Sequence, residues 1–345
     1  MFYGCTNIKV SETQTGIYKK PYRIPTEGTG TIGSDSLTDM FGNTGGTFTG
    51  TPEINRTYYV QEGFFIEAVE NTTITLAKVG SPTVGVAKYR INNGPFTNYT
   101  YGTNITLNTG DKCYWEIGKN TSINFNTSNY IHFTSIGAIN AGGNLSSLIG
   151  GETSIPRNYY FCNLFRDCTN LVDASAINFA SITDFNSKDN CYSGMFYGCT
   201  SLSAAPELPA TTLTSLCYNS MFEGCTSLTT APELPATTLA NQCYFFMFYG
   251  CTSLATAPEL LATTLTYECY RSMFRGCTNL TTAPELPATT LAYGCYYEMF
   301  RDCTSLTTAP ELPATTLADH CYDSMFDSCT SLTTIPELPA TTLAD

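Results

Sequence analysis

The sequence predicts a repeat solenoid, with a short strand and a short helix in each 26-residue coil, joined to an all-β sandwich-like domain. From Cys191 onward, one unit recurs at a period of 26 residues, which is typical of a solenoid. Residues 58–150 instead alternate apolar and polar side chains, as half-buried strands do. Charge also divides the chain, since residues 1–159 carry 11 basic and 11 acidic side chains and residues 160–345 carry 5 and 18.

Residues 1–57 are predicted to be the end of an upstream repeat array and its strand and loop cap. The first eight residues, MFYGCTNI, correspond to the middle of the unit that recurs after Cys191. Gly and Thr dominate residues 26–31 and 42–47, which favours loops. We therefore expect the sequence to be a fragment of a longer protein, beginning inside one repeat and ending inside another.

Residues 58–150 are predicted to form a β-sandwich of the immunoglobulin-like kind, with roughly seven strands. Asn93-Gly94 is a typical hairpin turn, and Trp115 is the only tryptophan of the chain. We expect one face of the strands to form the core: Phe64, Ile66, Ala68, Ile74, Leu76, Ile105, Leu107, Cys113, Trp115 and Ile117.

Residues 151–190 are predicted to be a degenerate capping repeat. Tyr160 to Leu171 is a divergent copy of the unit, and the spacing from Cys168 to Cys199 is 31 residues instead of 26. Solenoids commonly begin with an atypical unit, because the outer face of the first coil meets no neighbour.

Residues 191–345 are predicted to be the array itself, truncated at its C-terminal end. The apolar positions that never change between copies follow a spacing of i, i+1, i+4, i+5 and i+8, which indicates a helix of about two turns. In the third copy they are Cys243, Tyr244, Met247, Phe248 and Cys251. The following residues 252–260 favour a short strand, kept to two or three residues by Pro258, and Leu265 is expected to point inward.

Twelve of the sixteen cysteines recur as two columns, those of Cys191 and Cys199. Eight residues of helix span about 12 Å, too far for a disulfide within a coil. Equivalent cysteines of adjacent coils could approach one another, but we expect a ladder of buried thiols that pack as small apolar groups. No CxxC pair is present, so no zinc site and no cofactor are expected.

The units of the array share a motif that reads MFxGCTSLTTAPELPATTL. Through Met221-Phe222, Cys225, Leu228 and Pro232 in one copy, this motif resembles the leucine-rich repeats of the BspA-like family of bacterial surface proteins. The resemblance implies a leucine-rich repeat solenoid outside the cell or on its surface, where it adheres to or recognises proteins, cells or glycans.

The binding surface is predicted from the positions that differ between copies of the repeat. The core residues are the same in every copy, so packing does not determine which residue stands at these variable positions. In the middle copies they are aromatic and cationic, a composition typical of interfaces. The predicted residues are Phe245, Phe246, Tyr249, Tyr267, Arg271, Arg275, Tyr293, Tyr297 and Arg301. A column of carboxylates also recurs, at Glu207, Glu233, Glu259, Glu285, Glu311 and Glu337. We expect these to be solvated, with Ca²⁺ binding as the alternative.

The composition argues against several functions. The net charge is −13, from 16 basic and 29 acidic side chains, so a nucleic acid is not the expected partner. The only two histidines, His132 and His320, lie far apart in the chain, which argues against a histidine-based catalytic triad or metal site. We therefore expect that this chain is not an enzyme and does not span a membrane. We expect instead a recognition protein, whose ligand is a protein or glycan on a host or neighbouring cell. Two alternatives are a structural spacer and a phage fibre or receptor-binding component, either carrying a functional domain elsewhere. A third is an accessory part of a carbohydrate-active enzyme.

Overall fold

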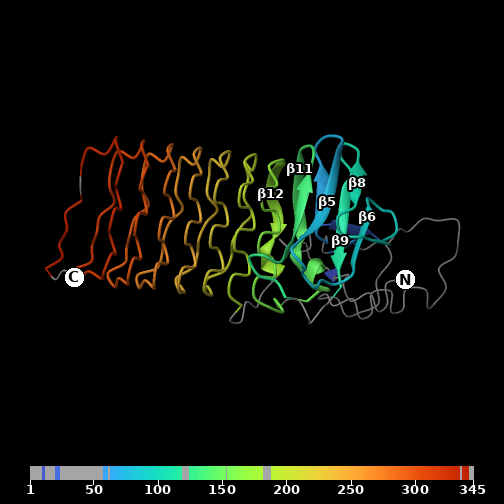
Figure 1. Cartoon of the computed structure of the whole chain (residues 1–345), viewed down its shortest axis with the longest axis horizontal. Helices are drawn as coiled ribbons and strands as arrows, with labels where there is room; N and C mark the ends of the chain where they lie inside the picture. Colours follow the sequence, from blue (N-terminus) through green and yellow to red (C-terminus); the bar gives the residue numbers. More distant parts are fainter. Residues whose placement is uncertain are drawn as a thin grey trace.

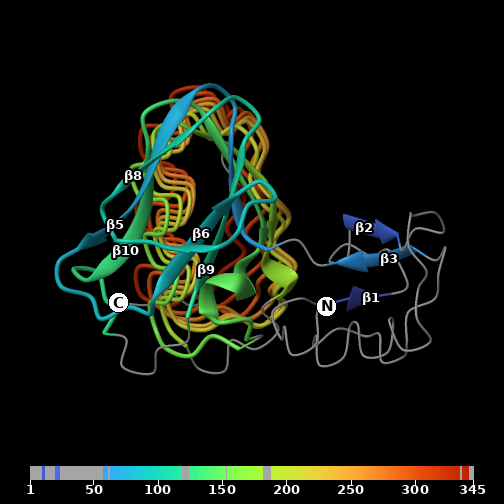
Figure 2. The same cartoon turned by 90° about the vertical axis from the view of Figure 1, so that its right-hand side faces the viewer.

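The computed structural model describes residues 10–11, 20–23, 57–60, 63–118, 124–152, 154–181, 188–334 and 336–341. Here the chain is mostly β: sheets in the N-terminal half precede a stack of coils along the long axis (Figure 1). Viewed along the stack, successive coils superpose (Figure 2). The predicted repeat fragment at 1–8 and the Gly-Thr-rich stretches lie outside the described residues.

The strands form three sheets. The first has the order β1-β3-β2 and is antiparallel: β1 (Val10–Ser11), β3 (Thr57–Val60) and β2 (Lys20–Arg23). The second is also antiparallel: β10 (Tyr130–Ser135), β5 (Thr72–Val79) and β8 (Asn104–Leu107). The third has six strands: β12 (Leu171–Asn178), β11 (Ile139–Asn144), β4 (Phe65–Ala68), β9 (Lys112–Ile117), β6 (Ala87–Ile91) and β7 (Thr97–Asn98). Two short 3₁₀ helices, η1 (Leu145–Ile149) and η2 (Phe179–Ser181), follow β11 and β12.

The predicted core of the β-domain is confirmed. All ten side chains predicted to share one face are buried, and Trp115 is 1% exposed. The indole packs edge to face on Phe133 of β10 at 5.2 Å between ring centroids, so the second and third sheets share one core. The hairpin at Asn93-Gly94 is also present: it joins β6 to β7, and the Gly94 amide donates to the Ile91 carbonyl.

The helix predicted in each coil is wrong, and no α-helix occurs in the residues that the structure describes. A chain of turns takes its place. In residues 242–250 the amides of Phe245, Met247 and Tyr249 each donate to the carbonyl three residues back. The intervening amides donate to the next coil, as from Phe248 to the Met273 carbonyl at 2.9 Å. Each coil is thereby joined to its neighbour by main-chain hydrogen bonds. In an α-helix these amides would donate to carbonyls of the same helix.

Every fourth residue of these turns has a left-handed backbone. In the third copy the residues are Gln242, Phe246 and Gly250, with φ of 56°, 57° and 69°. The buried pairs Cys243-Tyr244 and Met247-Phe248 therefore repeat at a period of four. Over nine residues a period of four and the helical period of 3.6 are hard to separate, which is why the apolar pattern suggested a helix.

We number the coils from the first left-handed residue: coil one begins at residue 190, and coils two to six at 216, 242, 268, 294 and 320. Their predicted strand is shorter than expected. Only single parallel bridges remain, such as Thr230 to Thr256 and Thr256 to Thr282. Pro258 follows two residues after the bridging Thr256, and because proline has no amide hydrogen it ends the ladder there. The eight-residue β12, which precedes coil one, contains no proline and is a continuous strand.

One hydrophobic core runs from the β-domain through the coils, from Phe64 to Met325. β11 pairs in parallel with β12, and Asp173 of β12 bridges to Ala204 of coil one, so main-chain pairing passes from the domain into the stack. Gly142 of β11 allows this approach, because a Cβ there would lie 2.8 Å from Ala176 Cβ. The β-domain thus covers the N-terminal edge of the array.

Within the array, aromatic rings of equivalent positions stack from coil to coil. Phe222, Phe248 and Phe274 lie 5.6 Å apart between successive centroids and are nearly parallel. Tyr244 and Tyr270 form a second column with the same spacing. The side chains predicted to be core are 0–1% exposed in coil three, and Leu265 points inward at 4%.

Candidate functional site

The nine residues predicted to bind lie on the surface of the turns, which we call the turn face: residues 242–250, 268–276, 294–302 and 320–328, with 267, 293 and 319 before them. Aromatic contacts link them within and between coils. The ring centroids of Phe245 and Phe246 lie 4.1 Å apart. The Arg271 guanidinium lies 5.4 Å from the ring centroid of Phe245 and 4.6 Å from that of Tyr297. The structure therefore brings together residues from three different coils.

Two of the nine are well exposed, Tyr267 and Tyr293, each at 42%. They occupy equivalent positions in coils three and four, and their rings stack at 5.3 Å with 7° between planes. The other seven are partly buried. The tyrosine pair is thus the part of the candidate site most open to a partner.

The arginines of the turn face are held by carboxylates that the sequence analysis missed. Glu268 and Glu298 are 4% and 7% exposed. Glu268 accepts from Arg271 Nη1 at 2.5 Å and from Gln242 Nε2 at 2.8 Å. Glu298 accepts from Arg275 Nη1 at 2.5 Å and from Arg301 Nη1 at 2.7 Å. A signal was present, since Glu268 and Glu298 each precede an arginine by three residues.

These ion pairs tie particular coils to each other. Arg275 of coil four reaches Glu298 of coil five, and Arg301 of coil five reaches Asp327 of coil six at 3.1 Å. The variable polar residues thus add contacts between neighbouring coils, so some of the predicted binding residues also stabilise the stack.

The thiol columns are free and buried. No disulfide joins the fifteen cysteines within the described ranges, and all but Cys329 are buried. The second column has a hydrogen-bonding role: Cys251 Sγ donates to the Phe222 carbonyl of the preceding coil at 3.1 Å, and Cys277 repeats this on Phe248. Burial raises the pKa of the Cys217 thiol to about 12 and that of Cys269 to about 11. Such thiols are poor nucleophiles and metal ligands at neutral pH.

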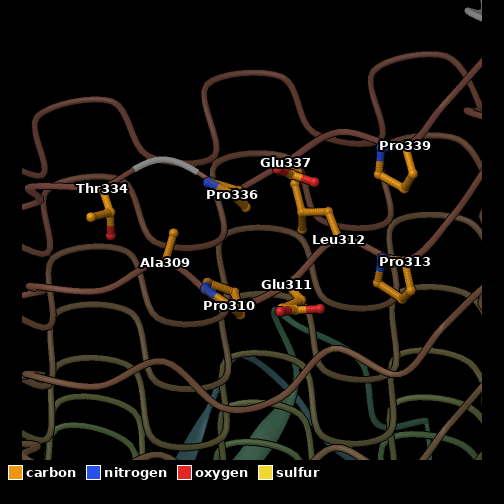
Figure 3. Close-up of a pocket in the computed structure, with 9 residues that line it drawn as sticks. All are labelled: Ala309, Pro310, Glu311, Leu312, Pro313, Thr334, Pro336, Glu337 and Pro339. Atoms are coloured by element: carbon orange, nitrogen blue, oxygen red, sulfur yellow. The ribbon is translucent and has the colours of Figure 1, made fainter.

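The glutamate column, from Glu207 to Glu337, is exposed along the proline-rich side of the coils. Between coils five and six this side is hollowed, with a cavity of about 510 Å³. Figure 3 shows its lining: Ala309, Pro310, Glu311, Leu312, Pro313, Thr334, Pro336, Glu337 and Pro339. In the described part of the chain, no three His, Cys, Asp or Glu side chains come together as a metal site.

Comparisons with known proteins give no further assignment. No family model matches the chain, and neither the curated proteins nor the solved structures contain a match. Among the described residues, no helix is long and apolar enough to cross a membrane.

Proposed function

We propose that this chain is a non-enzymatic recognition protein of the cell surface or extracellular space, which binds a protein or glycan on a host or neighbouring cell. We also propose that its coils are leucine-rich repeats of the BspA-like kind and that its β-domain is an immunoglobulin-like sandwich. The motif MFxGCTSLTTAPELPATTL supports the first assignment, and the two sheets around one core support the second.

The observation that carries the proposed function is the stacked, exposed pair Tyr267 and Tyr293. Tyrosines are enriched at the centres of protein interfaces, where one side chain supplies a large apolar area and a polar tip. Coils three and four place them on a surface where the sequence varies from coil to coil, while the proline-rich side repeats the same Thr, Pro and Glu.

A structural spacer is the second candidate, and one observation favours it. The three arginines of coils four and five are already paired with Glu268 and Glu298, so part of the variable surface serves the stack itself. A spacer, including one within a phage fibre, requires such rigidity and no ligand.

Replacing both Tyr267 and Tyr293 by Ser is expected to abolish binding to whichever component the protein captures from a panel of bacterial cells, mucin glycans and matrix proteins. Both rings are exposed, so the variant should keep the fold. The matched control is Leu261→Ser, another exposed apolar residue, at 45%. If no panel component binds the unmodified protein, the recognition proposal is wrong and the spacer is favoured. If the double variant binds as well as the control, the tyrosine pair is not the binding surface.

A further inference from the structure

We propose that the turn face binds a basic polypeptide segment, through Tyr267 and Tyr293 together with the carboxylates of Asp319 and Asp323. The inference rests on the proposed function and names the chemistry of the partner. It joins three observations: the exposed tyrosine pair, the use of the arginines inside the protein, and the acidic residues that continue the tyrosine column.

The first step concerns the positive charge of the turn face. Arg271, Arg275 and Arg301 are its arginines, and each lies within 2.7 Å of a buried carboxylate oxygen. Arg301 also contacts Asp327 at 3.1 Å. Residues 189–345 contain no other Lys or Arg. Each cation of the turn face is therefore already neutralised by a carboxylate, so an anionic partner would find little net positive charge there.

The second step concerns what continues the column. Position 267 recurs as 293 and then as 319, so Asp319 stands in the next coil where the two tyrosines stand in theirs. Asp319 is exposed, and so is Asp323 four residues further on. His320 connects the tyrosine pair to these carboxylates. Its ring centroid lies 5.3 Å from that of Tyr293, and its Nδ1 lies 3.1 Å from Asp323 Oδ2.

The third step concerns the partner. A Lys or Arg side chain gains from the face of a tyrosine and from a nearby carboxylate together, and the two contributions select against acidic partners. The array around the site reinforces this selection, since residues 160–345 carry 18 acidic and 5 basic side chains. The turn face thus fits a segment that presents Lys or Arg side chains to the tyrosine pair and to the neighbouring carboxylates.

The test uses the full chain and three probes: a synthetic peptide of alternating lysine and serine, its glutamate counterpart, and maltohexaose as a neutral glycan. Binding is measured by fluorescence anisotropy for the labelled peptides and by calorimetry for the sugar, in about 0.1 M salt to screen distant charges. We expect the lysine peptide alone to bind. Its affinity should fall about tenfold in Tyr267→Ser/Tyr293→Ser and about tenfold in Asp319→Asn/Asp323→Asn.

The matched control is Glu259→Gln/Glu285→Gln, which removes two exposed carboxylates from the proline-rich side and should change the affinity less than about twofold. Equal losses in the control and in Asp319→Asn/Asp323→Asn would overturn the proposal, because the peptide would then be attracted by the whole acidic array. Binding of the glutamate peptide or of maltohexaose instead would also overturn it. If the panel assay still shows binding that depends on Tyr267 and Tyr293, only the partner class is wrong and the proposed function stands.

Discussion

Raising the pH from about 8 to about 11 under reducing conditions is expected to unfold the array. Burial raises the pKa of Cys217 to about 12 and that of Cys269 to about 11, and it raises the pKa of Cys251 and Cys277 as well. In the unfolded chain a thiol ionises near pH 8.5. The folded array therefore retains protons that the unfolded chain releases, so stability is intact below about pH 8.5 and falls as the pH approaches the folded values.

The size of this effect follows from the number of thiols. Each thiol held neutral costs roughly 1.4 kcal/mol for each pH unit above its unfolded pKa. Domains are stable by only about 5 to 15 kcal/mol, so a few thiols acting together suffice. Circular dichroism and thiolate absorbance should change in one transition, reversible on return to pH 7. Thiolate absorbance that rises near pH 9 while the fold stays intact would show that the thiols are accessible and the prediction is wrong.

Replacing Glu298 by Gln is expected to lower the free energy of unfolding by about 2 to 3 kcal/mol. The change keeps the shape of the side chain but removes the buried charge that accepts from Arg275, Arg301 and Ser272. The side chains of Arg275 and Arg301 are 26% and 32% exposed, so water partly solvates the two guanidinium groups and limits the loss of stability. Chemical denaturation measures the difference.

The control for Glu298→Gln is Asp327→Asn, which removes a second carboxylate of Arg301. Its side chain is 46% exposed, so the loss should stay below about 1 kcal/mol. Equal losses for the two variants would mean that burial of Glu298 contributes nothing and that the turn face holds only ordinary surface ion pairs.

The sequence predicted the period of the array and its core well, because a repeated core position is the same position in every coil. Met247 and Phe248 were assigned to the core and are fully buried. It failed on the main-chain structure of the same segment, since pairs of apolar residues four apart fit a helix and a chain of turns equally. The glycines at 198, 224, 250 and 276 were the available signal, because glycine is favoured where φ is positive.

The candidate site was predicted in part. Variation between copies located Tyr267 and Tyr293, which are exposed and stacked. The same argument did not find Glu268 and Glu298, because sequence alone does not show which charges become buried. Their role depends on contacts between coils. These contacts follow from the chain of turns that is hydrogen-bonded from coil to coil, here called the turn ladder, which the sequence did not reveal.

The measurement that tests the turn ladder most directly is the change in unfolding free energy on replacing Gly250 by Ala. Gly250 has φ of 69°, and nothing lies within 4 Å of the Cβ that Ala would add, so the substitution tests the backbone alone. Gly118→Ala is the control, since its φ is not left-handed and its Cβ would meet Val86 at an ordinary 3.6 Å. The ladder predicts a loss of about 1 kcal/mol for Gly250→Ala and little change for the control. A helix would gain about 1 kcal/mol from the same change, so a stabilised Gly250→Ala variant would contradict the account.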